Sequence, residues 1–230
     1  MPDLLIASLS RAFGYLHAQG TEIPLDIQLK ARQFGVIKAA GDFAGVNKAY
    51  HDAITQALTT YFEGGSITAP RNAFKRATIQ AFSDAFDLGW TDGGGELPID
   101  NDAISWLEAR LNQEVGFIDM LFQEAKELRK DAEFDYFSWL TAKADGYTGT
   151  LRELYNAGKL RAMKDQMVTF DGEDGRESCD TCKMLKGKRH KISWFVKRNY
   201  VPPYGTGLQC ARGGQCQHGL MNDAGDWITV

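Results

Sequence analysis

The chain has 230 residues, of which 43% are apolar and 24% are charged, and its formal net charge is −4; these values are ordinary for a globular protein. No apolar stretch approaches the roughly 18 residues that a membrane-spanning helix requires. Residues 1 to 20 also lack the basic start and apolar core of a secretory signal. We therefore expect a soluble protein, made in the cytoplasm, that has no membrane partner.

The charges are unevenly distributed along the chain. Residues 1 to 170 carry 23 acidic and 17 basic side chains, whereas residues 171 to 230 carry 7 and 9. The length allows either one substantial core or two modest domains. The two parts are therefore expected to face different surroundings.

The first 90 residues have the spacing of amphipathic helices. The expected helices cover residues 24–40, 46–63 and 70–88, and in each the apolar positions recur every three or four residues. Gly64 and Gly65 follow the second helix, and Pro70 stands where a first helical turn tolerates proline. The run from Asp92 to Gly95 has the composition of a flexible linker.

A single very long helix is predicted next, because apolar residues keep the same spacing from Ile104 to Leu140. Unbroken, it would be about 55 to 60 Å long, with Gly116 as the expected kink. Such a length suits a bundle or an assembly contact. Four aromatic residues crowd its end on more than one face, so they are expected to pack in the core or at an interface: Phe134, Tyr136, Phe137 and Trp139.

The chain then changes character. A short helix is expected over residues 150–157, and residues 167–170 are the first with strand composition. The remainder is rich in Gly, Pro and charge, so it cannot form a large core and needs a covalent or metal staple. We predict a mainly α protein with a helical domain over residues 1–162 and a small α+β, Cys/His-rich module over residues 163–230.

All four cysteines lie in this last region, together with two of the four histidines. Cys179 and Cys182 form a C-x2-C pair that can grip a tetrahedral metal ion from one side. A structural zinc is the first hypothesis, and its remaining ligands would come from Cys210, Cys216 and His218, with His190 as a possible replacement for one of them. Two disulfides and reduced, buried thiols are the alternatives, and a reducing cytosol argues against disulfides.

The segment around the cysteines is basic and contains aromatic residues. It has seven positive charges between Lys183 and Arg198, and the combination is one that nucleic-acid surfaces use. The alternatives are a solvated face and a contact with an acidic protein neighbour. The residues expected to contact nucleic acid are Lys186, Lys188, Arg189, Lys191 and Trp194.

A catalytic role finds little support in the sequence. His190 and His218 lie near thiols in the chain, but no pattern pairs them as a base with a nucleophile. No glutamate beside a histidine is placed as the base of a hydrolytic zinc site. We therefore predict that the protein is not an enzyme, with a zinc hydrolase or nuclease as the least favoured alternative.

One stretch resembles a known family. It consists of the strand Met167–Phe170, Asp174-Gly175-Arg176, the C-x2-C pair, Leu185-x-Gly187, Trp194, Pro202-Pro203 and the region from Cys210 to His218. This order is similar to the C-terminal module of tailed-phage minor head proteins, the head-morphogenesis proteins similar to the F protein of phage Mu. The family usually closes with His-x-x-Cys-x-Cys, whereas this chain has Cys210-x5-Cys216-x-His218.

The resemblance implies a minor capsid protein of a bacteriophage virion, made in the cytoplasm of a bacterial host. Such a protein would lie near the portal vertex or in the head-to-tail region, where it would contact portal or capsid proteins and possibly the packaged DNA. It would be present in several copies or as a homo-oligomer. A zinc-dependent nucleic-acid-binding protein remains the alternative function.

Overall fold

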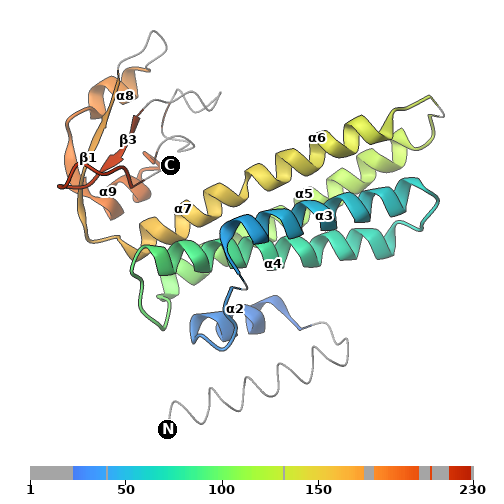
Figure 1. Ribbon diagram of the computed structural model, residues 1–230, viewed down its shortest axis with the longest axis horizontal. Coiled ribbons are helices and arrows are strands. Elements are labelled where there is room, and N and C mark those ends of the chain that lie inside the picture. Colours follow the sequence, from blue (N-terminus) through green and yellow to red (C-terminus); the bar gives the residue numbers. More distant parts are fainter. Residues whose placement is uncertain are drawn as a thin grey trace. The chain divides into compact units, whose positions relative to one another are not determined.

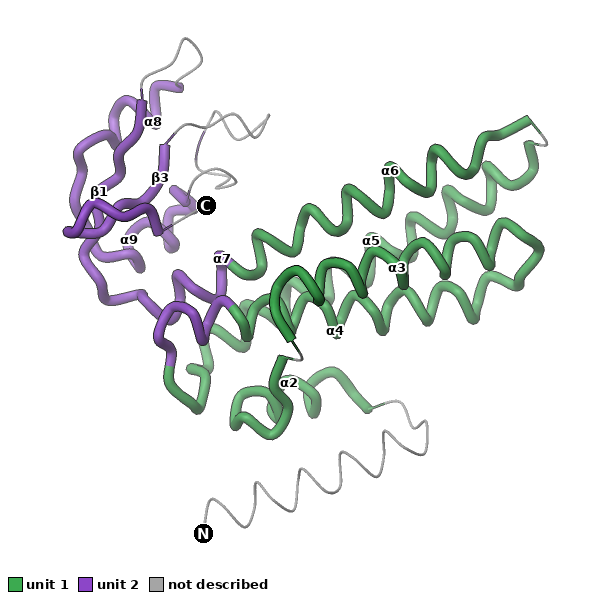
Figure 2. Tube along the Cα trace, viewed as in Figure 1, with its two compact units in different colours: residues 1–88, 96–155 green, residues 89–95, 156–230 purple. Residues whose placement is uncertain are grey.

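The computed structural model describes residues 23–39, 41–131, 133–173, 179–201, 208 and 218–228. Its described part is mainly helical, with one small sheet (Figure 1). The chain divides into two compact units, one made of residues 1–88 and 96–155 and the other of residues 89–95 and 156–230 (Figure 2). None of the helices in the described ranges is both long enough and apolar enough to cross a membrane.

Unit 1 is a bundle of helices. Its elements are α2 (Leu25–Gln33), α3 (Phe43–Phe62), most of α4 (Thr68–Asp92), α5 (Asn101–Leu128), α6 (Tyr136–Gly149) and the start of α7 (Leu151–Ala162). The long helices lie side by side, with α3 packed along α6, and α2 contacts α5 (Figure 1).

The bundle core is largely aromatic. Tyr50 of α3 meets Phe74 and Phe82 of α4 edge to face, and Phe74 in turn meets Phe122 of α5 and Tyr147 of α6. Tyr50, Phe74, Phe82 and Phe122 are all fully buried. The three-four spacing puts these rings on one face of each helix. Helices α3 and α4 confirm the helices expected at residues 46–63 and 70–88.

The first helix is shorter than predicted. The expectation covered residues 24–40, but α2 ends at Gln33. Gly35 takes a left-handed conformation with φ +71°, which a residue with a side chain adopts only at a cost. The Gly35 N–H donates to the Arg32 carbonyl and the Val36 N–H to the Ala31 carbonyl, so the chain turns away in a Schellman motif.

The single very long helix predicted over residues 104–140 is wrong, because two helices occupy that stretch. Helix α5 ends at Leu128 and α6 begins at Tyr136, while α5 runs through Gly116 without interruption. The Asp135 side chain accepts a hydrogen bond from the Ser138 N–H and so caps a new helix. The apolar spacing continues across the turn, so periodicity alone does not reveal the reversal.

The reversal brings most of the aromatic residues at this turn onto α3. Phe62 stacks on Tyr136 with ring centroids 5.2 Å apart, and it also meets Phe134 and Trp139. Phe137 is exposed to solvent. Three of the four aromatic residues therefore pack within unit 1.

The glycine run at residues 93–95 forms a tightly packed turn. A Cβ atom at Gly93 would lie 2.6 Å from the Lys159 carbonyl oxygen, and one at Gly95 would lie 2.3 Å from the Trp90 indole nitrogen. Glycine is required here because the backbone approaches α7 closely. The expected flexible linker is therefore a packing element of unit 2.

Unit 2 contains the module that follows α7. Its elements are β1 (Met167–Gly172), α8 (Asp180–Leu185), β2 (Arg189–Lys191), α9 (Ile192–Lys197) and β3 (His218–Met221). The sheet has the order β2-β1-β3, and both neighbours run antiparallel to β1. The strand expected at residues 167–170 is confirmed.

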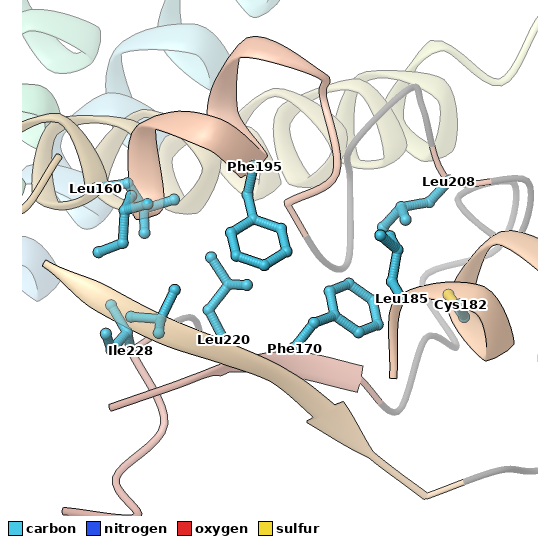
Figure 3. Close-up of a cluster of buried hydrophobic side chains, with 10 residues drawn as sticks. Leu160, Phe170, Cys182, Leu185, Phe195, Leu208, Leu220 and Ile228 are labelled. Carbon is cyan, nitrogen blue, oxygen red and sulfur yellow. The ribbon is translucent and has the colours of Figure 1, made fainter. Parts of the chain in front are cut away.

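The module has a small apolar core of its own (Figure 3). Side chains from β1, the outer strand β3, both short helices and the end of α7 meet in it. Phe170 stacks on Phe195 with centroids 6.2 Å apart. The buried members are Leu160, Val168, Phe170, Cys182, Leu185, Ile192, Phe195, Leu208, Leu220 and Ile228.

Candidate functional site

The C-x2-C pair lies at the start of α8. Cys179 is the residue before the first helical turn, and its sulfur accepts a hydrogen bond from the Cys182 N–H at 3.4 Å. Cys179 is half-buried, and Cys182 is buried beside Leu185 in the module core (Figure 3). Zinc binds cysteine in its thiolate form.

The two candidate histidines lie at opposite ends of the central strand. His218 pairs with Gly172, the last residue of β1, after which the chain continues to Cys179. His190 pairs with Val168, four residues earlier, which is about 13 Å along a strand. The sheet therefore separates the two histidines.

Each histidine is stacked on an aromatic side chain. The His218 ring is buried against Phe170, with centroids 5.5 Å apart. The His190 ring lies parallel to the Trp194 indole at 4.0 Å. Both rings therefore contribute to packing in the module.

The metal hypothesis rests on two described thiols. Within the residues that the structure covers, no group of three or more His, Cys, Asp or Glu side chains could hold a metal ion. Cys210 and Cys216 lie outside the described residues, as do residues 174–178 and 202–207 of the family-like stretch. The four-ligand zinc site stays a prediction; of its candidate ligands, the structure describes Cys179, Cys182 and His218, with His190 as the replacement.

Two of the predicted nucleic-acid contacts form ion pairs within the module. The Arg189 guanidinium donates to both carboxylate oxygens of Asp223, at 3.0 and 2.7 Å. Lys191 pairs with Asp165 at 3.0 Å, and this hydrogen bond holds the pKa of Asp165 below its usual value. These cations are compensated by neighbouring carboxylates.

Trp194, the aromatic candidate, is half-buried and covered by other side chains. In addition to the His190 stack, the Arg198 guanidinium lies over its ring at 4.3 Å. Base stacking needs an open ring face, so these contacts compete with nucleic acid. Lys186 and Lys188 are exposed. The structure therefore gathers the candidate residues in one module but uses three of the five in internal contacts.

Some charged side chains are buried in the bundle, and they were not predicted from the sequence. The Arg32 guanidinium, only 3% exposed, pairs with Asp84 at 2.8 Å and with Asp87 at 2.6 Å. Burial raises the pKa of Asp87 to about 6, while Arg32 opposes the rise. The signal in the sequence is the pair of aspartates three residues apart within an otherwise apolar face of α4.

A second buried polar group lies deeper in the bundle. The Tyr50 hydroxyl hydrogen bonds with Thr78 at 2.9 Å, and burial raises the pKa of that tyrosine. Arg110 and Glu114 form an ion pair one turn apart on α5. Burial also raises the pKa of Glu153, and the positive charge of Arg110 opposes this rise. The hydrogen bond between Tyr50 and Thr78 joins α3 to α4, and buried polar contacts of this kind fix how helices align.

Comparison with known proteins gives no match, either to a family model, to a curated protein or to a solved structure. Interpretation of function therefore depends on the residues of the module and on their order in the chain.

Proposed function

We propose that this chain is a structural, non-catalytic component of a tailed-phage virion, acting in the head or at the portal vertex. The proposal starts from the resemblance of residues 167–218 to the C-terminal module of minor head proteins. On this proposal the protein is made in the bacterial host cytoplasm and is incorporated into the particle. Portal or capsid proteins are then its partners.

One observation carries the proposal: the described residues of the family-like stretch build the fold of a compact module. Phe170 and Leu185 are buried in its core. Gly187 has φ +75°, and its N–H donates to the Phe170 carbonyl at 2.8 Å. A left-handed φ favours glycine. A motif whose residues pack and turn the chain is typical of a structural attachment module.

A structural zinc would suit this module. Its core is small, and domains of this size commonly need a staple. Cys179 and Cys182 would supply two thiolates, and the remaining ligands would come from Cys210, Cys216 and His218. When bound, the ion would tie together segments that are distant in sequence. On this proposal it has no catalytic part.

The test is made on phage particles from a host that carries the gene. Purified particles should contain peptides of this chain, in far fewer copies than the major capsid protein, by quantitative mass spectrometry. Deleting the gene should reduce the yield of infectious particles, and a plasmid copy of the wild-type gene should restore it.

Two matched glycine variants connect this phenotype to the module. Gly187→Val places a branched side chain at a left-handed φ and should fail to restore the particles. Gly116→Val makes the same change on α5, where a Cβ meets nothing within 4 Å, and should restore them. Absence of the chain from particles, together with normal particle yield after deletion, would refute the proposal. Salt-sensitive DNA binding in that case would favour the nucleic-acid-binding alternative.

A further inference from the structure

Unit 1 ends in a surface with one exposed aromatic ring and an acidic surround. Phe137 lies in the first turn of α6, and its side chain is 68% exposed. Asp131, Glu133 and Asp135 are exposed close to it in the chain. Hydrogen bonds from Ser138 lower the pKa of Asp135, which keeps this carboxylate charged. We call Phe137 with these three carboxylates the acidic tip.

Unit 2 has a stretch of exposed residues with a net positive charge, in which three lysines outnumber one exposed carboxylate, that of Asp180. Met184 of α8 is 56% exposed, and the exposed residues Lys183, Lys186 and Lys188 flank it in the chain. Lys183 and Lys188 form no ion pair with any residue that the structure describes. We call Met184 with these three lysines the basic face.

We propose that the acidic tip of one copy of this chain binds the basic face of a second copy. Each surface has one large exposed apolar side chain with exposed charged residues near it in the chain, and an interface built on such residues would have an apolar centre and a polar rim. Their charges are opposite, so the encounter is attractive and correctly oriented. Tip against tip or face against face would instead bring like charges together.

The two surfaces differ, so the contact is heterologous. Each copy keeps one unused surface after pairing, and copies can therefore add head to tail into a ring or a filament. The inference concerns the chain alone and does not depend on its being a virion protein. Association should weaken with salt because the rim charges are solvent-exposed.

The first experiment is sedimentation velocity of the full-length protein at low and high salt. The wild type should associate at low salt, and Phe137→Ser and Lys188→Glu should each weaken the association by about tenfold or more. Met120→Ser removes an exposed apolar side chain and Lys197→Glu reverses an exposed positive charge, both at positions outside the two surfaces. These two controls should associate like the wild type. All four positions are exposed, and circular dichroism confirms folding of each variant.

The second experiment mixes the two defective variants. Phe137→Ser keeps an intact basic face and Lys188→Glu an intact acidic tip, so the mixture should form a one-to-one complex by native mass spectrometry. Complex formation from two variants that do not self-associate is specific to a heterologous contact. A mixture that stays monomeric would overturn the proposal.

The remaining outcomes are equally decisive. A wild type that is monomeric at low salt and high concentration would overturn the proposal, as would association that neither variant changes. Such results would leave the virion proposal standing, because its own test counts copies in particles. Conversely, head-to-tail association in a protein absent from particles would refute only the virion proposal.

Discussion

The two units reach a folded state by different means. The bundle buries large aromatic side chains along helices of 14 to 28 residues, so its core is extensive and continuous. Among its described residues, the module closes a core of ten buried side chains over a three-stranded sheet. A small core gives little surplus stability, so the module should depend much more strongly on single residues and on a staple.

The two units also differ in how deeply their ion pairs are buried. The bundle encloses ion pairs such as Arg32 with Asp84 and Asp87, whereas the module pairs Arg189 with Asp223 in exposed positions. Breaking an enclosed pair leaves an uncompensated charge in the interior, whereas an exposed pair contributes little. The bundle is therefore the unit in which a charged substitution should be costly.

The largest expected effect tests the staple. Removing zinc from the metal-loaded protein with a chelator should unfold the module and spare the bundle, because binding of a structural zinc contributes about 10 kcal/mol or more to folding. Limited proteolysis should then cut within residues 163–228, while helical circular dichroism persists. Cys179→Ser should behave like the chelated protein. Unchanged protease resistance after chelation would contradict the staple.

The next effect compares equal truncations in the two cores. Phe170→Ala in the module and Phe74→Ala in the bundle each remove a fully buried ring, at a cost of roughly 3 to 5 kcal/mol. The module should unfold outright, whereas the bundle should stay folded with a lower melting temperature. Hydrogen exchange resolved by segment measures both. If both truncations left their units folded, the expected difference in stability between the two cores would be contradicted.

A smaller effect is expected at the buried ion pairs. Arg32→Ala leaves Asp84 and Asp87 enclosed without their cation and should cost about 3 kcal/mol or more. Lys48→Ala removes an exposed pair with Asp52 and should leave the stability nearly unchanged, because solvent screens the pair. Urea titration of the bundle helix signal gives both values. Loss of amide protection from hydrogen exchange should begin in α2, because Arg32 links α2 to α4.

The smallest effect is a pH dependence of the bundle. The pKa of Asp87 is raised from an ordinary 3.8 to about 6, mainly by burial, with Arg32 and Asp84 as the charged groups acting on it. The folded state therefore holds this proton more tightly than the unfolded state. The stability that Asp87 contributes is present below pH 4 and is lost as pH rises through 6.

Asp87→Asn removes this dependence because the amide does not titrate. The variant should gain stability relative to the wild type between pH 4 and 7, by on the order of 2 kcal/mol. Chemical denaturation at several pH values measures the difference. A constant difference across that range would contradict the assignment to Asp87.

Parts of the fold were accessible from the sequence because local rules decide them. The three-four spacing that begins with Val46, Tyr50 and Ile54 predicted α3, and Gly64 predicted where α3 ends. The strand composition of residues 167–170 predicted β1. Each feature depends on residues that are neighbours along the chain.

Other features depend on residues that are distant in sequence. The turn between α5 and α6 brings Tyr136 and Trp139 onto Phe62, and the apolar spacing does not distinguish it from a continued helix. Arg32 reads as an ordinary surface cation until α4 places two aspartates beside it. The pairing of Arg189 with Asp223 likewise required the sheet.

The sequence by itself determined the helical character of the described residues between 23 and 162 and the concentration of thiols in the last region. Periodicity and composition act within a few turns of chain, and they are visible without a fold. The tertiary structure decided which charges are buried, which aromatic ring stays exposed and which histidine lies at each end of β1. Those outcomes are set by packing between elements, because burial and pairing depend on neighbours that the chain order does not reveal.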